Sequence, residues 1–258
     1  MPVLLVTNDD GVHATGLRAL AEALEDVGEV YVIAPDREQS AVGHALTLHR
    51  PLRVERLGDR RFSVNGTPSD AVNLGILGVL PETPVLVVSG INHGPNLGDD
   101  VTYSGTVSAA MEGTLLGIPS IAVSLETSEA GFAEAARIAR LCALRVLVDG
   151  LPPRTLLNVN IPATPPKGIR VTQLGQRVYK EKVIEQTDPR GRTHYWIGAG
   201  PPEWDRNEAT DIAAIHAGYA SITPVHLDLT HFGALARMAD WGGTLTAQYR
   251  ARPRADER

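Results

Sequence analysis

The chain has 258 residues, of which 43% are apolar and 21% are charged, with a formal net charge of −6. This length and balance fit a globular protein of one large domain, or of a domain with an extension. The negative charge argues against a nucleic-acid polymer as partner, because proteins that bind one usually carry a basic patch. The one cysteine, Cys142, excludes a disulfide framework within the chain, and its apolar surroundings predict a buried helix thiol.

Neither a membrane segment nor an export signal is expected. No apolar run approaches the roughly 20 residues that are needed to cross a bilayer. The opening residues, MPVLLVTNDD, lack a basic region, and their apolar stretch is too short for a signal peptide. We therefore expect a cytoplasmic protein.

Strand and helix patterns alternate through the first part of the chain. Residues 2–7 form a short apolar run that is typical of a buried strand, residues 15–27 place apolar side chains on one helical face, and residues 29–35 form a second apolar run. This order indicates a βαβ unit with parallel strands. Further elements are expected as a hairpin within 52–66, helices at 70–80, 105–117 and 131–150, and strands at 84–90, 118–125 and 155–162.

The pattern changes after about residue 165, so we divide the chain into a core, residues 1–165, and a C-terminal extension, residues 166–258. Strand-like segments at 169–175 and 220–229 are expected to complete the sheet. The fold class predicted from these elements is α/β, with a mostly parallel sheet.

Residues 176–207, between those two segments, are polar and aromatic and contain the turn signal DPRGR. A loop of this length in a compact domain is usually functional or an arm. We predict a protruding β-hairpin arm that contacts another subunit. An amphipathic terminal helix is expected at 231–243.

Polar side chains follow three of the predicted strands. Asp9 and Asp10 come after the first strand, Ser40 comes in the loop after the second, and Asn92 follows the strand at 84–90. Open parallel sheets bind ligands at the edge where such strands end. Carboxylate, hydroxyl and carboxamide oxygens suit Mg²⁺ or Mn²⁺. The two adjacent aspartates taken alone fit a solvated turn equally well, but the convergence of three strand ends favours a metal site.

The stretch TYSGTVSAAMEG carries a second signal, because Ser104, Gly105 and Thr106 stand where a helix begins. Free backbone N–H groups and the helix dipole make such a position suitable for an anion, and a glycine permits close approach. Helix capping by Ser104 or Thr106 explains this stretch equally well in isolation. A neighbouring metal makes phosphate the more economical interpretation.

Five stretches resemble the SurE survival-protein family of nucleotidases: TNDDG, APDREQS, NGTPSDAV, VVSGINHGPNLGDDVTYSGTVSAAMEG and SITPVHLDLT. They run in order from residue 3 to about residue 230. The resemblance implies a metal-dependent phosphatase that acts on nucleoside 5′- and 3′-monophosphates, and in some members on short polyphosphate. It implies one divalent ion per subunit, Mg²⁺ or Mn²⁺, held by Asp9, Asp10, Ser40 and Asn92. It also implies a Rossmann-like sheet with helices on both faces, and a C-terminal arm exchanged within a homodimer or homotetramer.

The expected mechanism is an in-line attack of water on a phosphoryl group held at the metal. Asp9 or Asp10 is the candidate to orient or deprotonate this water. Four residues are expected to hold the remaining phosphoryl oxygens: Asn96, Ser104, Gly105 and Thr106. A covalent aspartyl-phosphate ranks below direct attack, because both aspartates serve the metal. The alternative function is a metal-dependent nucleotide sensor with the same pocket and no turnover.

Overall fold

The computed structural model describes residues 1–126, 131–178, 183–197, 203–204 and 207–251. The chain divides into two compact units, of which the first is Met1–Leu227 and the second begins at Asp228. The functional division that we predicted after residue 165 stays a prediction. None of the helices in the described residues combines the length and the apolar character that crossing a bilayer needs.

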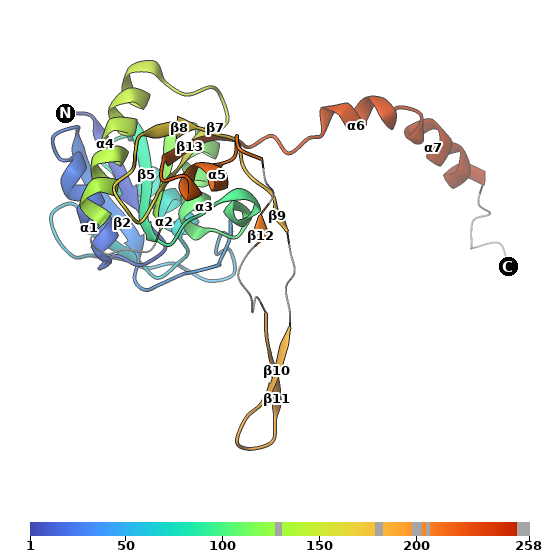
Figure 1. The fold of residues 1–258 in the computed structure, drawn as a ribbon, viewed down its shortest axis with the longest axis horizontal. Helices are drawn as coiled ribbons and strands as arrows, with labels where there is room; N and C mark the ends of the chain where they lie inside the picture. The colour runs from blue at the N-terminus through green and yellow to red at the C-terminus, as the bar shows by residue number, and fades with distance from the viewer. Residues whose placement is uncertain (127–130, 179–182, 198–202, 205–206, 252–258) are drawn as a thin grey trace. The chain divides into compact units, whose positions relative to one another are not determined.

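A nine-stranded sheet forms the centre of the first unit, in the order β3-β4-β2-β1-β5-β6-β7-β13-β8 (Figure 1). Its strands are β1 (Val3–Thr7), β2 (Glu29–Pro35), β3 (Val54–Arg56), β4 (Arg61–Val64), β5 (Leu86–His93), β6 (Ser120–Leu125), β7 (Thr155–Ile161), β8 (Ile169–Val171) and β13 (Ala220–His226). The strands from β4 to β7 in this order are parallel to one another. β3 pairs antiparallel with β4, and β13 pairs antiparallel with β7. The mostly parallel sheet and the hairpin within 52–66 are therefore confirmed.

Helices cover both faces of this sheet. The main ones are α1 (Thr15–Leu24), α2 (Pro68–Leu74), α3 (Gly105–Leu115) and α4 (Phe132–Asp149). Leu4 belongs to a core with α1 and α4, whereas the next residue, Leu5, belongs to a core with α2 and α3, because successive side chains of a strand face opposite sides. Cys142 is buried in α4 as predicted, and this burial raises the pKa of its thiol to about 11.

The predicted helix at 70–80 begins earlier and changes its winding. α2 starts with a capping box, in which the Thr67 side chain accepts the N–H of Asp70 and the Asp70 carboxylate accepts the N–H of Thr67. Pro68 follows as the first helical residue, a position that needs no N–H donor. A π-helical turn, η1 (Gly75–Val79), continues α2.

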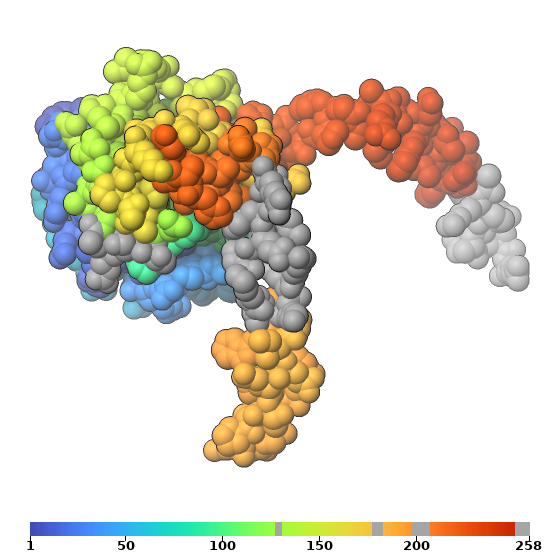
Figure 2. All heavy atoms as spheres, viewed as in Figure 1, coloured from blue at the N-terminus to red at the C-terminus, as the bar shows by residue number. Residues whose placement is uncertain are grey.

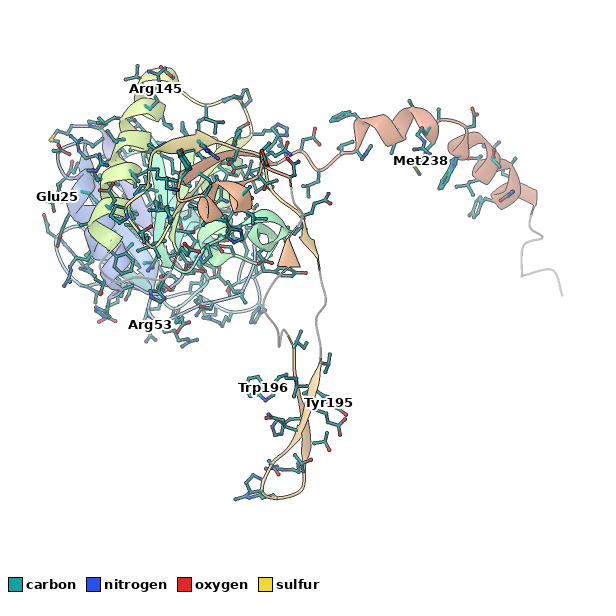
Figure 3. All side chains as sticks on the ribbon, viewed as in Figure 1. Glu25, Arg53, Arg145, Tyr195, Trp196 and Met238 are labelled. Carbon is teal, nitrogen blue, oxygen red and sulfur yellow. The ribbon has the colours of Figure 1, made fainter. Side chains whose placement is uncertain are left out.

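Two small antiparallel sheets lie within the predicted arm. β9 (Arg177–Val178) pairs with β12 (Glu203–Trp204), and β10 (Ile184–Thr187) pairs with β11 (Thr193–Trp196). The hairpin turn is the predicted DPRGR stretch, where the Asp188 carboxylate accepts the N–H groups of Arg190 and Arg192. Figure 3 shows Tyr195 and Trp196 on this hairpin, and both side chains are exposed. Contact of the hairpin with another subunit stays a prediction, and residues 179–182, 198–202 and 205–206 of the predicted arm lie outside the described residues.

Within residues 228–251, the part of the second unit that the structure describes, there are two helices, α6 (Phe232–Arg237) and α7 (Trp241–Ala251), where we predicted one helix at 231–243. His231 caps α6 by accepting the N–H of Ala234, and α6 ends before Met238. The carbonyl of Asp240 accepts the N–H of Thr244, so a new helix starts there. A turn at residues 238–240 separates the two helices.

Candidate active site

The carboxyl ends of β1, β2 and β5 meet at one edge of the sheet, and a cavity of about 540 Å³ opens there. Six of the predicted residues line it: Asp9, Asp10, Ser40, Asn92, Asn96 and Ser104. Because the three strands run in parallel, the loops that follow them reach the same edge. The structure thus places these six residues at one cavity, and their roles in binding and catalysis stay predictions.

Gly105 and Thr106 lie behind Asp9 and are absent from the described cavity lining. The Thr106 hydroxyl donates a hydrogen bond to Asp9 Oδ1, and the Thr106 side chain is fully buried. A Cβ atom at Gly105 would stand 2.7 Å from Asp9 Cβ and 2.8 Å from Asp9 Oδ2, so only glycine fits there. In this structure both residues therefore set the position of Asp9, and their direct contact with a phosphoryl group stays a prediction.

Asp9 is a carboxylate in an unfavourable place for a negative charge, since only 5% of the residue is exposed. Burial raises the pKa of Asp9 to about 6. The Thr106 hydrogen bond lowers this pKa, and the neighbouring charge of Asp10 raises it. A cation in the cavity would relieve both the burial cost and the repulsion, which is the pattern expected of a metal ligand.

Two further carboxylates, Glu38 and Asp100, line the same cavity and were not among the predicted residues. Burial raises the pKa of Asp10, the backbone N–H of His93 lowers it from 3.4 Å, and the charge of Glu38 raises it. None of the described lining residues is an arginine or a lysine. The cavity thus favours a cation. Glu38 and Asp100 follow strands within polar loops, so the strand-end rule could have found them.

The donor chemistry of Ser40 and Asn92 fits an oxygen-preferring cation. The Ser40 hydroxyl donates to Glu38 Oε1 at 2.7 Å, so the lone pairs of its oxygen stay available. The Asn92 amide nitrogen donates to the carbonyl of Gly94 at 2.8 Å, so its Oδ1 is the group left for a ligand. In the described residues no three His, Cys, Asp or Glu side chains cluster as a metal site. The predicted ligand set therefore depends on these two neutral oxygens beside Asp9 and Asp10.

Asn96 is held by a network of buried amides on β7. Its backbone N–H donates to Asn160 Oδ1 at 2.8 Å, and its carbonyl accepts from the amide nitrogens of Asn158 and Asn160, each at 2.9 Å. Its own amide nitrogen donates to Ser124 Oγ at 2.7 Å. The network fixes the position of Asn96 at the cavity wall and uses one of the two N–H donors of its amide, and its contact with phosphate stays a prediction.

Ser104 caps α3, because its Oγ accepts the N–H of Val107 at 3.1 Å. The first N–H groups of a helix have no partner within the helix. At Gly105 and Thr106 these groups lie beside the carboxylate of Asp9, where the helix dipole favours negative charge. The cap uses the N–H of Val107 and Asp9 accepts the backbone N–H of Thr106, so binding of a further anion at this helix start stays a prediction.

A larger cavity of about 740 Å³ lies at the opposite edge of the sheet, beside Gly28 where β2 begins. Its wall carries charges of both signs, and two pairs lie close together: Arg18 with Glu22 at 3.9 Å and Arg60 with Glu29 at 3.5 Å. Such exposed pairs neutralise each other and select for no ligand charge. The smaller cavity, with its unbalanced carboxylates, is therefore the candidate active site.

Known proteins resemble this chain over most of its length. The profile of the family described as "Survival protein SurE" matches residues 4–181. A Syntrophotalea carbinolica protein named 5′-nucleotidase SurE is 54% identical over 245 residues, which cover 94% of this chain and 98% of that protein. A Pelobacter propionicus protein of the same name is 56% identical over 243 residues, covering 92% and 98%.

A solved structure is also similar. The crystal structure of the SurE protein from Aquifex aeolicus superposes with a TM-score of 0.84 at 47% identity, covering 94% of this chain and 100% of that one. The profile match, the identities and the shared fold span the strands and loops that form the cavity. This chain therefore belongs to the SurE family.

Proposed function

We propose that the chain is a divalent-metal-dependent phosphatase that hydrolyses nucleoside 5′-monophosphates to nucleoside and phosphate. One observation carries the proposal: Asp9, Asp10, Ser40 and Asn92 line one cavity together with Ser104, which caps α3. Relatives named 5′-nucleotidase SurE support the choice of a nucleotide as substrate. Nucleoside 3′-monophosphates and short polyphosphate are included in the proposal as further substrates.

The proposed ligands of one Mg²⁺ or Mn²⁺ ion are Asp9, Asp10, Ser40 and Asn92. Their hard oxygen donors suit either ion, and the excess of carboxylates in the cavity supports a cation over an anion as resident group. Neutralisation of charge on the phosphoryl oxygens is the chemistry that a divalent ion supplies at such a site.

The protein's own groups hold the phosphoryl group and orient water. The backbone N–H groups at the start of α3 and the Ser104 side chain bind phosphoryl oxygens. We assign the water to Asp10, because Asp10 is more accessible than Asp9, whose Oδ1 already accepts from Thr106. Asp10 accepts a proton from this water as it attacks phosphorus in line; the bond from phosphorus to the nucleoside oxygen breaks, and that oxygen takes up a proton from solvent to give the nucleoside hydroxyl.

Phosphate release from AMP tests this function. The protein should release phosphate with Mg²⁺ or Mn²⁺ present, lose this activity in EDTA, and recover it when the metal is restored. Asp10→Asn should abolish turnover and leave the melting temperature close to the wild-type value. Nucleotide binding without phosphate release would instead identify a metal-dependent nucleotide sensor, and activity that persists in EDTA would contradict the metal.

The affinity for the metal should depend on pH through Asp9. Its raised pKa, about 6, means that a proton competes with the ion as the pH falls through this value. Affinity for Mn²⁺ should therefore be full above about pH 7 and fall about tenfold per unit below about pH 6. Calorimetric titrations across this range measure it. Thr106→Val should move the decline to higher pH, because the hydroxyl lowers the pKa of Asp9, whereas an affinity that is flat across the range would contradict the assignment.

We also propose that the hairpin β10–β11 joins subunits in a homodimer or homotetramer. The exposed apolar side chains of Tyr195, Trp196 and Ile197 support this, since clustered exposed apolar groups mark interaction surfaces. Light scattering of the wild-type protein and of Trp196→Ser tests it.

A further inference from the structure

Asp211 is a fully buried carboxylate that backbone groups from two distant segments bind. It is the first residue of α5 (Asp211–His216), which is drawn in orange at the surface of the first unit in Figure 2. Its Oδ2 accepts the N–H of Gly98 at 2.9 Å, and its Oδ1 accepts the N–H groups of Gly175 and Ile212, each at 2.9 Å. A buried charge is costly unless donors surround it, and these three bonds offset part of that cost, although burial still raises the pKa of Asp211.

The two distant segments are the loop that forms one wall of the cavity and the base of the predicted arm. Gly98 begins a 3₁₀ turn, η2 (Gly98–Thr102), which leads directly to Ser104. The cavity-lining residues on either side of Gly98 are Asn96, Asp100, Tyr103 and Ser104. Gly175 lies two residues before β9, the first strand of the arm. One carboxylate thus binds the cavity loop with one oxygen and the arm base with the other.

The backbones around Asp211 meet without spare room. Gly98 has a φ of +53°, and a Cβ there would stand 2.6 Å from the carbonyl oxygen of Gly175. A Cβ at Gly175 would overlap Ile212 Cδ1. Leu97 packs in one small core with Ile212 and Ile215, and β9 contacts η2. A shift of any one of these backbones must therefore move the others.

We propose that Asp211 is a positioning residue for the phosphatase reaction, which fixes the loop 96–104 at the cavity and ties it to the base of the arm. This inference rests on the proposed function. Displacement of Gly98 would move Asn96 on one side and Asp100 and Ser104 on the other, away from Asp9 and Asp10 in the loop after β1. Movement of the arm thus reaches the cavity through Asp211.

Asp211→Asn tests the inference. Asparagine keeps one acceptor oxygen and turns an NH₂ group toward a backbone donor, so the bond to either Gly98 or Gly175 is lost. The kcat/KM for AMP should fall about 10- to 100-fold, the range for residues that orient metal-site groups from outside. Hydrogen exchange at the Gly98 or Gly175 amide should accelerate at least about tenfold.

Thr210→Ala is the matched control. Thr210 caps α5, because its Oγ1 accepts the N–H of Ala213 at 3.3 Å, but it has no bond to Gly98 or Gly175 among the described contacts. Loss of the Thr210 hydroxyl weakens the same helix, α5. If Asp211 served only to stabilise α5, both variants would therefore lose activity equally. We expect kcat/KM of Thr210→Ala to stay within about twofold of wild type, with protection at Gly98 retained.

Gly175→Ala disturbs the hydrogen bond between Gly175 and Asp211 from the side of the arm, because its new methyl group displaces Ile212 and the N–H of residue 175. It should lower kcat/KM as Asp211→Asn does, and the double variant should show less than the product of the two effects. Unchanged kcat/KM in folded Asp211→Asn, or an equal loss in Thr210→Ala, would overturn the inference.

Amide exchange and AMP binding decide the inference even if the variant does not fold or the wild-type protein releases no phosphate. If Asp211→Asn does not fold, amide exchange of the wild-type protein decides, because Gly98 and Gly175 share one acceptor residue and should open together; unequal opening overturns the inference. If the wild-type protein releases no phosphate, the proposed function fails. The coupling of Gly98 and Gly175 through Asp211 can then still be measured by amide hydrogen exchange and by the affinity for AMP.

Discussion

Replacing Asp9 by asparagine should abolish phosphate release and at the same time stabilise the metal-free protein. The loss of activity follows from the loss of a proposed ligand, and we expect it to exceed the roughly 100-fold effect of residues that act on a metal site from outside. The gain in stability follows from the burial of Asp9, of which 5% is exposed. Asparagine removes the buried charge and keeps an oxygen that accepts from Thr106.

The pH dependence of this gain follows from the direction of the pKa shift. Folding raises the pKa of Asp9 from 3.8 to about 6, so the folded state binds the proton more tightly than the unfolded state does. The carboxyl group therefore costs nothing below about pH 4, and its full cost, at most about 3 kcal/mol, is reached above about pH 7.

Melting curves without metal at about pH 8 should show a rise in Tm of roughly 5–10 °C for Asp9→Asn, and almost none at about pH 4. Saturating Mg²⁺ should narrow the difference at the higher pH, because only the wild-type protein gains from binding the ion. Asp59→Asn, at a side chain that is 90% exposed, serves as the control and should change neither activity nor Tm. A fall in the Tm of Asp9→Asn at high pH would contradict the assignment of a destabilising charge.

Gly105→Ala should inactivate the protein although it adds one methyl group to a helix. The new Cβ would stand 2.7 Å from Asp9 Cβ and 2.8 Å from its Oδ2, which forces the carboxylate or the start of α3 to move. Displacements of about 1 Å at a reacting centre cost about 100-fold in rate, so we expect kcat to fall at least that much. Affinity for Mn²⁺ should fall with it.

Two glycines separate this effect from general destabilisation. Gly78→Ala meets nothing within 4 Å and should leave activity and Tm unchanged. In Gly113→Ala, on the same helix, the new Cβ would stand 2.5 Å from Ser120 Oγ. This variant should lower Tm while kcat at moderate temperature is retained. If Gly105→Ala resembles Gly113→Ala in both measurements, its glycine serves packing and not the site.

The convergence of the site could be predicted because it depends on strand direction alone. The apolar runs at 2–7, 29–35 and 84–90 identify buried parallel strands, and the polar residues after them must reach one edge. The same reasoning extends to Glu38, which lies in the loop after the strand at 29–35. Such inference works where a local pattern fixes both the element and its orientation.

The supporting contacts could not be predicted, because they join residues far apart in the chain. Thr106 reaches Asp9 across 97 positions, and Asp211 reaches Gly98 across 113. No local periodicity encodes such a pair, so Thr106 was assigned to phosphate as a helix-start residue. The break before α7 was missed for a different reason, since the amphipathic pattern runs without interruption through the turn at residues 238–240.

The place of β13 in the sheet has a consequence for synthesis on the ribosome. β13 lies between β7 and β8, although β8 precedes it in the chain. β8 therefore has no neighbour to pair with until residue 226 of the 258 has left the exit tunnel. Until β13 has emerged, β7 presents an open edge to other nascent chains, so the emergence of β13, well after the loops that carry Asp9, Ser40 and Asn92, sets the moment at which this edge is protected from aggregation.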